Sequence, residues 1–205
     1  MSFVFRKRFR ICRFFSQVFD GAFTATQCES FISLFERSQL FEGNVMSNGQ
    51  VFVDANAKKR WEFDISGAAN GGDETWAAMD RLATSVMTKY LIQYAKLNPG
   101  VSSLRNPLGE EGWRMNRYHD NGEEHHAYHI DAGQEPKGTP QRVLAAILYL
   151  SSVEQGGETV FLNQGVAVAP KCGRMLIFPS TFTHVHAGRR VRRGTKYMLT
   201  LMINS

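Results

Sequence analysis

The second half of the chain alternates short apolar segments with turns, and this pattern constrains the fold more than any other feature. The apolar run RVLAAILYL at residues 142–150 is typical of a strand that is buried on both faces. Glycine and proline punctuate the rest of this half, and we expect further short strands at residues 113–118, 159–162, 166–169, 174–178 and 197–203. Short strands with frequent turns predict a sandwich or a barrel.

The first half has two helical patterns. Thr26 and Glu29 have the spacing of a capping box, and the apolar residues that follow up to Phe35 recur at helical spacing. A second helix is predicted from near Asp73 up to the Asn98-Pro99-Gly100 sequence. Helices followed by strands predict one α+β domain, mainly β, over residues 1–205.

Composition narrows the class of protein further. Hydrophobic residues make up 43% and charged residues 21% of the 205 residues, which is ordinary for a folded globular domain. No apolar run approaches the roughly 18 residues of a membrane helix, so we expect no membrane span. The three cysteines, Cys12, Cys28 and Cys172, form no C-x-x-C pair, which disfavours a disulfide scaffold and favours a reducing, cytoplasmic compartment.

The net charge of +5 resides in the first 13 residues. This arm has five basic residues and no acid, and subtracting the five from 24 leaves 19 bases against 19 acids in the rest of the chain. A uniformly basic, nucleic-acid-binding domain is therefore disfavoured. We interpret the arm as an edge strand or solvated tail, with contact to a polyanion as the alternative; it lacks the apolar region of a secretion signal.

All six histidines lie between residues 119 and 186. His129-Ile130-Asp131 presents an imidazole and a carboxylate on one face if it is extended, because residues i and i+2 of a strand point the same way. His184 or His186, about fifty residues later, could add a second imidazole, and strand periodicity does not choose between them. Two histidines and one carboxylate leave metal positions open, as in non-haem Fe(II) oxygenases.

A basic residue in the last predicted strand adds an anion receptor. Lys196 shares one face of that strand with Thr200, and Tyr149, at the end of the apolar run, offers a phenol donor. A buried ammonium group with hydroxyl neighbours binds a carboxylate strongly. A divalent metal site beside such a receptor suits a dicarboxylate that chelates metal.

The sequence resembles the Fe(II)/2-oxoglutarate-dependent dioxygenase superfamily, specifically its prolyl 4-hydroxylase-like branch. The segments that carry the resemblance are RYHDNGEEHHAYHID, RVLAAILYLSSVEQGGETVF and GRMLIFPSTFTHVHAGRRVRRGTKYMLTLMI, and the opening VFDGAFTATQCESFISLFE matches more loosely. The resemblance implies a double-stranded β-helix, or jelly roll, that N-terminal helices brace. The single domain would then consist of a basic arm (1–13), a helical support with a lid (14–100) and a jelly-roll core that holds the metal site (101–205).

The resemblance also implies roles for individual residues. The iron ligands would be His129, Asp131 and His186. The 2-oxoglutarate contacts would be Lys196, Tyr149, Thr200 and Tyr118. The family spacing from the last histidine to the basic residue, nine or ten positions, selects His186 over His184. Lys196 stands where many relatives have arginine, and Met202 where many have tryptophan.

The implied activity is hydroxylation of a substrate that consumes 2-oxoglutarate and O2, requires Fe(II) and releases succinate and CO2. The resemblance to this branch implies a prolyl residue in a peptide or protein as the substrate. The family resemblance also implies that the activity depends on ascorbate. One alternative is a nucleic-acid or small-molecule hydroxylase; the alkylation-repair branch has a second arginine six positions after the first, where this chain has Met202. The other is a catalytically silent, cupin-like binder, which the intact ligand set disfavours.

Three surface features have two interpretations each. Residues 47–66, which contain Asn48-Gly49, are interpreted as a hairpin or a mobile loop, and we predict that residues 44–61 form a lid that closes over the entrance. His125 and His126 are interpreted as wall or surface residues in a turn, with a substrate-facing role as the alternative. The arginines at 189, 190, 192 and 193 form either a solvated loop or an entrance that attracts an acidic substrate.

Overall fold

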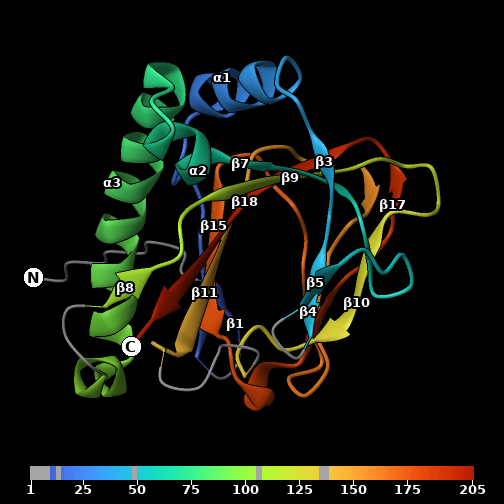
Figure 1. Cartoon of the computed structure of the whole chain (residues 1–205). Coiled ribbons are helices and arrows are strands. Elements are labelled where there is room, and N and C mark those ends of the chain that lie inside the picture. The colour runs from blue at the N-terminus through green and yellow to red at the C-terminus, as the bar shows by residue number, and fades with distance from the viewer. Residues whose placement is uncertain (1–9, 13–14, 48–49, 105–107, 134–138) are drawn as a thin grey trace, which may run out of the picture.

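The computed structural model describes residues 10–12, 15–47, 50–104, 108–133 and 139–205. Two antiparallel sheets pack face to face, and helices cover the outer face of the larger one (Figure 1). This architecture is a jelly-roll sandwich with helical support, which confirms the predicted fold class.

Among the described residues, the larger sheet contains nine strands. Their order is β1 (Arg10–Cys12), β2 (Ser16–Phe19), β15 (Arg174–Pro179), β11 (Arg142–Tyr149), β18 (Lys196–Asn204), β9 (Arg114–Tyr118), β7 (Trp61–Asp64) and β3 (Phe41–Glu42), with β8 (Gly109–Glu110) beside β18. The apolar run predicted as a doubly buried strand is β11, at the centre of this sheet. Both of its faces are apolar because helices cover one face of the larger sheet and the smaller sheet covers the other.

The smaller sheet contains five strands. Their order is β14 (Val166–Val168), β13 (Thr159–Phe161), β16 (His186–Gly188), β10 (His125–His129) and β6 (Lys58–Lys59). Two short pairs lie apart from both sheets: β12 (Gln155–Gly156) with β17 (Val191–Arg193), and β4 (Val45–Ser47) with β5 (Gln50–Phe52).

The helices are α1 (Ala25–Phe35), α2 (Ile65–Asn70) and α3 (Glu74–Leu97), with short 3-10 turns η1 (Pro99–Ser103) and η2 (Phe182–His184). Asp73 caps α3 by accepting hydrogen bonds from the backbone of Thr75 and Trp76. In the described part of the chain, no helix is long and apolar enough to cross a membrane.

The capping box of α1 differs from the prediction. Thr24 and Gln27 form it, two residues before the predicted Thr26 and Glu29. The chain is still extended at Thr24, so the Thr24 hydroxyl, 3.2 Å from the Gln27 nitrogen, reaches the first free backbone donors. Thr26 lies inside the first turn, where its side chain cannot cap.

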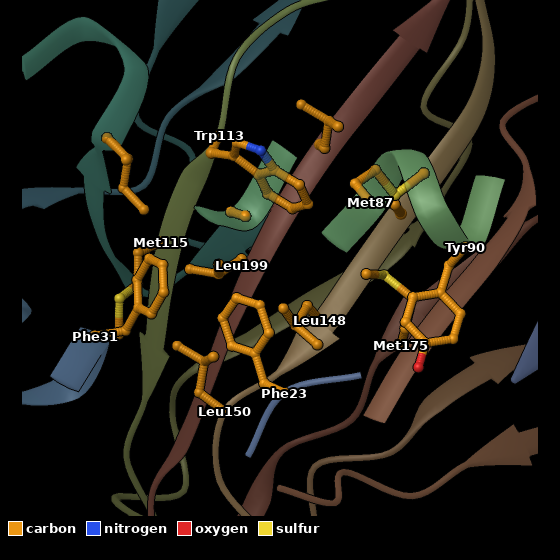
Figure 2. Packing of buried hydrophobic residues seen from close by; sticks show 14 of the residues in the cluster. Phe23, Phe31, Met87, Tyr90, Trp113, Met115, Leu148, Leu150, Met175 and Leu199 are labelled. Atoms are coloured by element: carbon orange, nitrogen blue, oxygen red, sulfur yellow. The ribbon is translucent and has the colours of Figure 1, made fainter. Parts of the chain in front are cut away.

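Alternation along β18 separates two cores. Leu199, Leu201 and Ile203 point toward the helices and join a large apolar cluster with residues of α1 and α3. Figure 2 shows Leu199 in this cluster beside Trp113 and Leu148. The alternate residues of β18, from Lys196 to Met202, point between the two sheets. The space between the sheets therefore receives the polar residues of the last strand.

The N-terminal half contains more strand than predicted. β7 joins the larger sheet beside β9, and β6 joins the smaller sheet beside β10. The end of the predicted lid, residues 58–61, is thus held in the sheets, because buried Lys58 and Arg60 pair with Glu62 inside the protein. Asn48 and Gly49 lie outside the described residues, as do 1–9 and 13 of the basic arm; β1, which contains residues 10–12, is an edge strand. The closing motion stays a prediction, now for residues 44–57.

Candidate metal centre

Two neighbouring strands of the smaller sheet bring three side chains together. His129 is the last residue of β10, Asp131 follows it by two residues, and His186 begins β16. The strands pair with His129 opposite His186. One nitrogen or oxygen atom from each of these three residues lies within 4.8 Å of the other two. His129 and Asp131 are therefore side by side, as their spacing predicts, although Asp131 lies just beyond the strand.

Hydrogen bonds orient both imidazole rings. His129 Nδ1 lies 2.8 Å from the carbonyl oxygen of Ala127, and His186 Nδ1 lies 3.0 Å from that of His184. A carbonyl oxygen only accepts, so each Nδ1 donates to it. Each Nε2 therefore carries the free lone pair and faces Asp131, at 3.4 Å in both cases.

The charge states also suit a metal. Burial lowers the pKa of His186 to about 4, so its ring is neutral at pH 7. Burial alone would raise the pKa of Asp131, but attraction to positive charge on the neighbouring basic side chains His186, His129 and Arg142 outweighs burial, and this pKa is lowered to about 2. Asp131 is therefore ionised at neutral pH.

The donor set has an unsatisfied atom that a cation would satisfy. Asp131 Oδ2 is buried and has no hydrogen-bond partner among the described residues, a costly state for a carboxylate oxygen. Metal bonds of about 2.1 Å at right angles place their ligand atoms about 3 Å apart, close to the 3.4 Å separations found here. Two imidazole nitrogens and one carboxylate oxygen thus fit a divalent ion such as Fe(II).

His184 lies outside this cluster. It ends η2, and its Nδ1 is 2.9 Å from the hydroxyl of Thr183. Its carbonyl accepts the hydrogen bond that orients His186. The chain turns through η2 rather than running straight from 184 to 186, which is why strand periodicity alone did not separate the two histidines.

A pocket that is open to solvent extends from the cluster into the space between the sheets. Its lining includes Arg60, Tyr118, His126, Ala145, Ala146, Ile147, Thr159, Phe178, Gly188, Lys196, Met198, Thr200 and Met202 besides the three clustered residues. One end carries the candidate metal ligands, and its walls are largely apolar.

Lys196 is a buried cation in this pocket. Only 1% of it is exposed, its Nζ donates to the carbonyl of Gly157 at 3.0 Å, and the Nζ lies 4.4 Å from the centre of the Tyr118 ring. Within the described chain no carboxylate is within ion-pair distance of it. Burial, with a smaller contribution from Arg60, lowers the pKa of Lys196 to about 7. An anion in the pocket would remove this penalty.

The other predicted contact residues divide into two groups. Tyr118 and Thr200 line the pocket, and Thr200 Oγ1 accepts a hydrogen bond from Asn116 Nδ2 at 3.0 Å. Tyr149 does not line it: its hydroxyl donates to Thr159 Oγ1 at 2.6 Å, and Thr159 is the residue that lines the pocket. Tyr149 therefore reaches the site through Thr159.

Sequence reasoning missed Arg60, and it expected His126 as a wall or surface residue but placed it in a turn; His126 lines the pocket. His126 belongs to β10 and not to a turn, and its ring stacks on that of His129 with centroids 3.6 Å apart. The bulge between these two residues turns both rings toward the pocket. For Arg60 there was a usable signal: Lys58, Arg60 and Glu62 recur with the period of a strand, so that two cations and one carboxylate share a face.

The remaining polar residues lie outside the pocket. His125 contacts the backbone carbonyls of Glu123 and Asn56 at the surface. The four arginines from 189 to 193 are exposed. Arg193 pairs with Glu154 at 2.8 Å.

Comparisons with known proteins agree with this site. Residues 113–204 match the family model of the 2OG-Fe(II) oxygenase superfamily. No curated protein matches the chain.

Three solved structures share the fold. The viral collagen prolyl hydroxylase of Paramecium bursaria Chlorella virus-1, solved as a 2OG complex, is 16% identical over 95% of this chain and 98% of its own, with a TM-score of 0.64. A Trichoplax adhaerens prolyl hydroxylase, solved with a peptide fragment of the hypoxia inducible factor oxygen degradation domain, is 18% identical over 92% and 83%, with a TM-score of 0.69. A Pseudomonas putida prolyl-4-hydroxylase is 17% identical over 92% and 91%, with a TM-score of 0.61.

The match of residues 113–204 to the model of the 2OG-Fe(II) oxygenase superfamily agrees with the resemblance seen in the sequence. The three similar structures are prolyl hydroxylases, and at 16–18% identity the likeness shows a shared fold.

Proposed function

We propose that this protein is an Fe(II)- and 2-oxoglutarate-dependent dioxygenase that hydroxylates a prolyl residue in a peptide or protein. The observation that carries the proposal is one pocket with His129, Asp131 and His186 clustered in its wall and the unpaired ammonium of Lys196 buried in the same space. A ligand that chelates a metal through one end and carries a carboxylate at the other matches both features, and 2-oxoglutarate has this structure.

The residues would divide the work as follows. The Nε2 atoms of His129 and His186, with the Asp131 carboxylate, would hold Fe(II). Lys196 would neutralise the distal carboxylate of 2-oxoglutarate, with Tyr118 and Thr200 as further contacts. Bound Fe(II) would activate O2, the oxidant, with 2-oxoglutarate as the co-reductant that is oxidised to succinate and CO2.

The pocket walls have a separate task. Ile147, Phe178 and Met198 present apolar surface between the sheets and keep water from the reacting groups. Thr159, backed by Tyr149, adds one hydroxyl to this wall.

A peptide substrate is supported by the similar structures and not by a contact in this chain. The three neighbours described above are prolyl hydroxylases, and one of them was solved with a peptide. The pocket is open to solvent, as access for a side chain on a peptide requires.

The test measures succinate release from 2-oxoglutarate by the purified protein with Fe(II) and O2, with and without ascorbate. Proline-containing peptides, free amino acids and single-stranded nucleic acids are compared as stimulants, and products are analysed by mass. We expect a gain of 16 Da on proline in a stimulating peptide. Stimulation by nucleic acid alone contradicts the peptide assignment, and absence of succinate under every condition contradicts the enzyme assignment.

A further inference from the structure

Arg60 is a second buried cation in the pocket, and the roles above do not use it. Only 8% of Arg60 is exposed, and its guanidinium enters the pocket from the segment between β6 and β7. Its Nη1 donates to the hydroxyl oxygen of Tyr118 at 2.7 Å, and its Nε donates to Glu62 Oε1, also at 2.7 Å. Arg60 is thus attached on one side to a pocket residue and on the other to a buried carboxylate.

The contact with Arg60 determines what the Tyr118 hydroxyl can do. A guanidinium group has donors only and cannot accept a hydrogen bond. The Tyr118 oxygen therefore accepts from Arg60, and its own proton must go to another acceptor. Tyr118 is fully buried, and within the described chain its hydroxyl has no acceptor. A buried donor without an acceptor is unfavourable, so the pocket lacks one acceptor at this position.

The missing acceptor lies on the same side as the missing anion. The Lys196 ammonium is 4.4 Å from the Tyr118 ring centre, and the two residues face each other across β18 and β9. A carboxylate placed on Lys196 could therefore also accept the proton of the Tyr118 hydroxyl. Lysine, tyrosine and arginine would then form one connected group, in which each donor has an acceptor.

We propose that Arg60 is a positioning residue for the cosubstrate, which makes the Tyr118 hydroxyl a donor to the carboxylate that Lys196 binds. The inference rests on the proposed function, because 2-oxoglutarate is the dicarboxylate concerned. Arg60 itself does not contact the cosubstrate: it acts through Tyr118.

The surroundings of Arg60 hold it in place for this role. Glu62 is fully buried, and its Oε1 accepts both Arg60 Nε and Lys58 Nζ, the latter at 2.9 Å. The second oxygen of Glu62 has only a long contact of 3.6 Å, to Arg114. Lys58 and Arg60 thus share the Glu62 carboxylate, whereas Lys196 has no carboxylate within ion-pair distance in the described chain, and this surplus of positive charge favours entry of an anion.

The experiment is a double-mutant cycle on ligand affinity. Anaerobic calorimetry with Mn(II) in the metal site measures binding of 2-oxoglutarate and of 2-oxovalerate, which lacks the distal carboxylate. The variants are Arg60→Met, Arg60→Lys, Tyr118→Phe and the Arg60→Met/Tyr118→Phe double variant. Arg117→Met is the matched control: it removes the same charge from the β9 residue that precedes Tyr118, and the Arg117 guanidinium pairs with Glu36 on the outer side.

We expect Arg60→Met to bind 2-oxoglutarate about 10-fold more weakly, the loss typical of one hydrogen bond to a charged group. Arg60→Lys, which still only donates, should recover most of that loss. In the Tyr118→Phe background, Arg60→Met should weaken 2-oxoglutarate binding by less than 2-fold. In the otherwise unchanged protein, Arg60→Met should weaken 2-oxovalerate binding by less than 2-fold as well. Arg117→Met should bind both ligands as the wild type does.

Three results would overturn the proposal. The first is that Arg60→Met binds 2-oxoglutarate with wild-type affinity. The second is that Arg60→Met weakens 2-oxoglutarate binding equally with Tyr118 and with Tyr118→Phe. The third is that Arg60→Met weakens binding of 2-oxovalerate as much as binding of 2-oxoglutarate. If Arg60→Met does not fold, Arg60→Lys and Tyr118→Phe decide, since the lysine keeps the ion pair with Glu62. The proposed function fails by a separate result: wild-type protein that binds 2-oxoglutarate releases no succinate. That result does not affect the interpretation of the double-mutant cycle, which measures binding alone.

Discussion

Replacing Lys196 by methionine should stabilise the protein while it removes the affinity for 2-oxoglutarate. The ammonium is buried with one carbonyl and one aromatic ring as its contacts. A decrease in its pKa from 10.5 to about 7 corresponds to a cost of about 5 kcal/mol for the charged form. Methionine has a similar length and no charge, so part of this cost, about 1–3 kcal/mol, should appear as added stability.

The pH dependence of this gain has a definite sign. Between pH 7 and 10.5 the lysine is protonated in the unfolded chain and neutral in the folded one, so the unfolded state binds more protons. The contribution of Lys196 to the free energy of unfolding therefore becomes less unfavourable as the pH rises over that range. The advantage of Lys196→Met should be largest at pH 7 and below, and should shrink toward pH 10.

The assay is thermal unfolding at pH 7 and pH 9.5, together with calorimetry of 2-oxoglutarate binding. At pH 7 the melting temperature should rise by about 5 °C, given about 2–4 °C per kcal/mol for a chain of this size. Affinity should fall about 30-fold or more, because the distal carboxylate loses its buried partner. Lys171→Met is the matched control, since Lys171 pairs with Asp20 at the exposed surface, and it should change stability by less than about 0.5 kcal/mol. A less stable Lys196→Met variant with intact 2-oxoglutarate affinity would refute the reasoning.

Three further predictions concern the metal centre and the lid. Asp131→Ala should fold but lose Fe(II) binding, because it removes the carboxylate from the cluster; iron content measured by mass spectrometry checks this, and stoichiometric iron in the variant contradicts it. His186→Ala should also lose iron, whereas His184→Ala should retain it; the reverse order in iron content would make His184 the ligand. Residues 44–57 should exchange amide hydrogens faster than β11 and slow down when 2-oxoglutarate and a substrate bind; exchange as slow as that of β11, unaffected by ligand, would exclude a lid.

Much of the fold followed from local pattern. Alternation along β18 places Lys196 and Thr200 on one face, and the doubly apolar sequence of β11 implies a central strand. The spacing of His129 and Asp131 implies adjacent side chains. These features depend on the geometry of a single strand, which the sequence encodes directly.

Tertiary structure decided how distant segments meet. Arg60 reaches Tyr118, 58 residues later in the sequence, because β7 pairs with β9, and no local period reveals such a pairing. His186 rather than His184 joins Asp131 because η2 turns the chain just before β16. The sequence by itself determined which residues share a face of each strand. Strand pairing and its register, which depend on packing across the whole domain, decided which of those faces enclose the pocket.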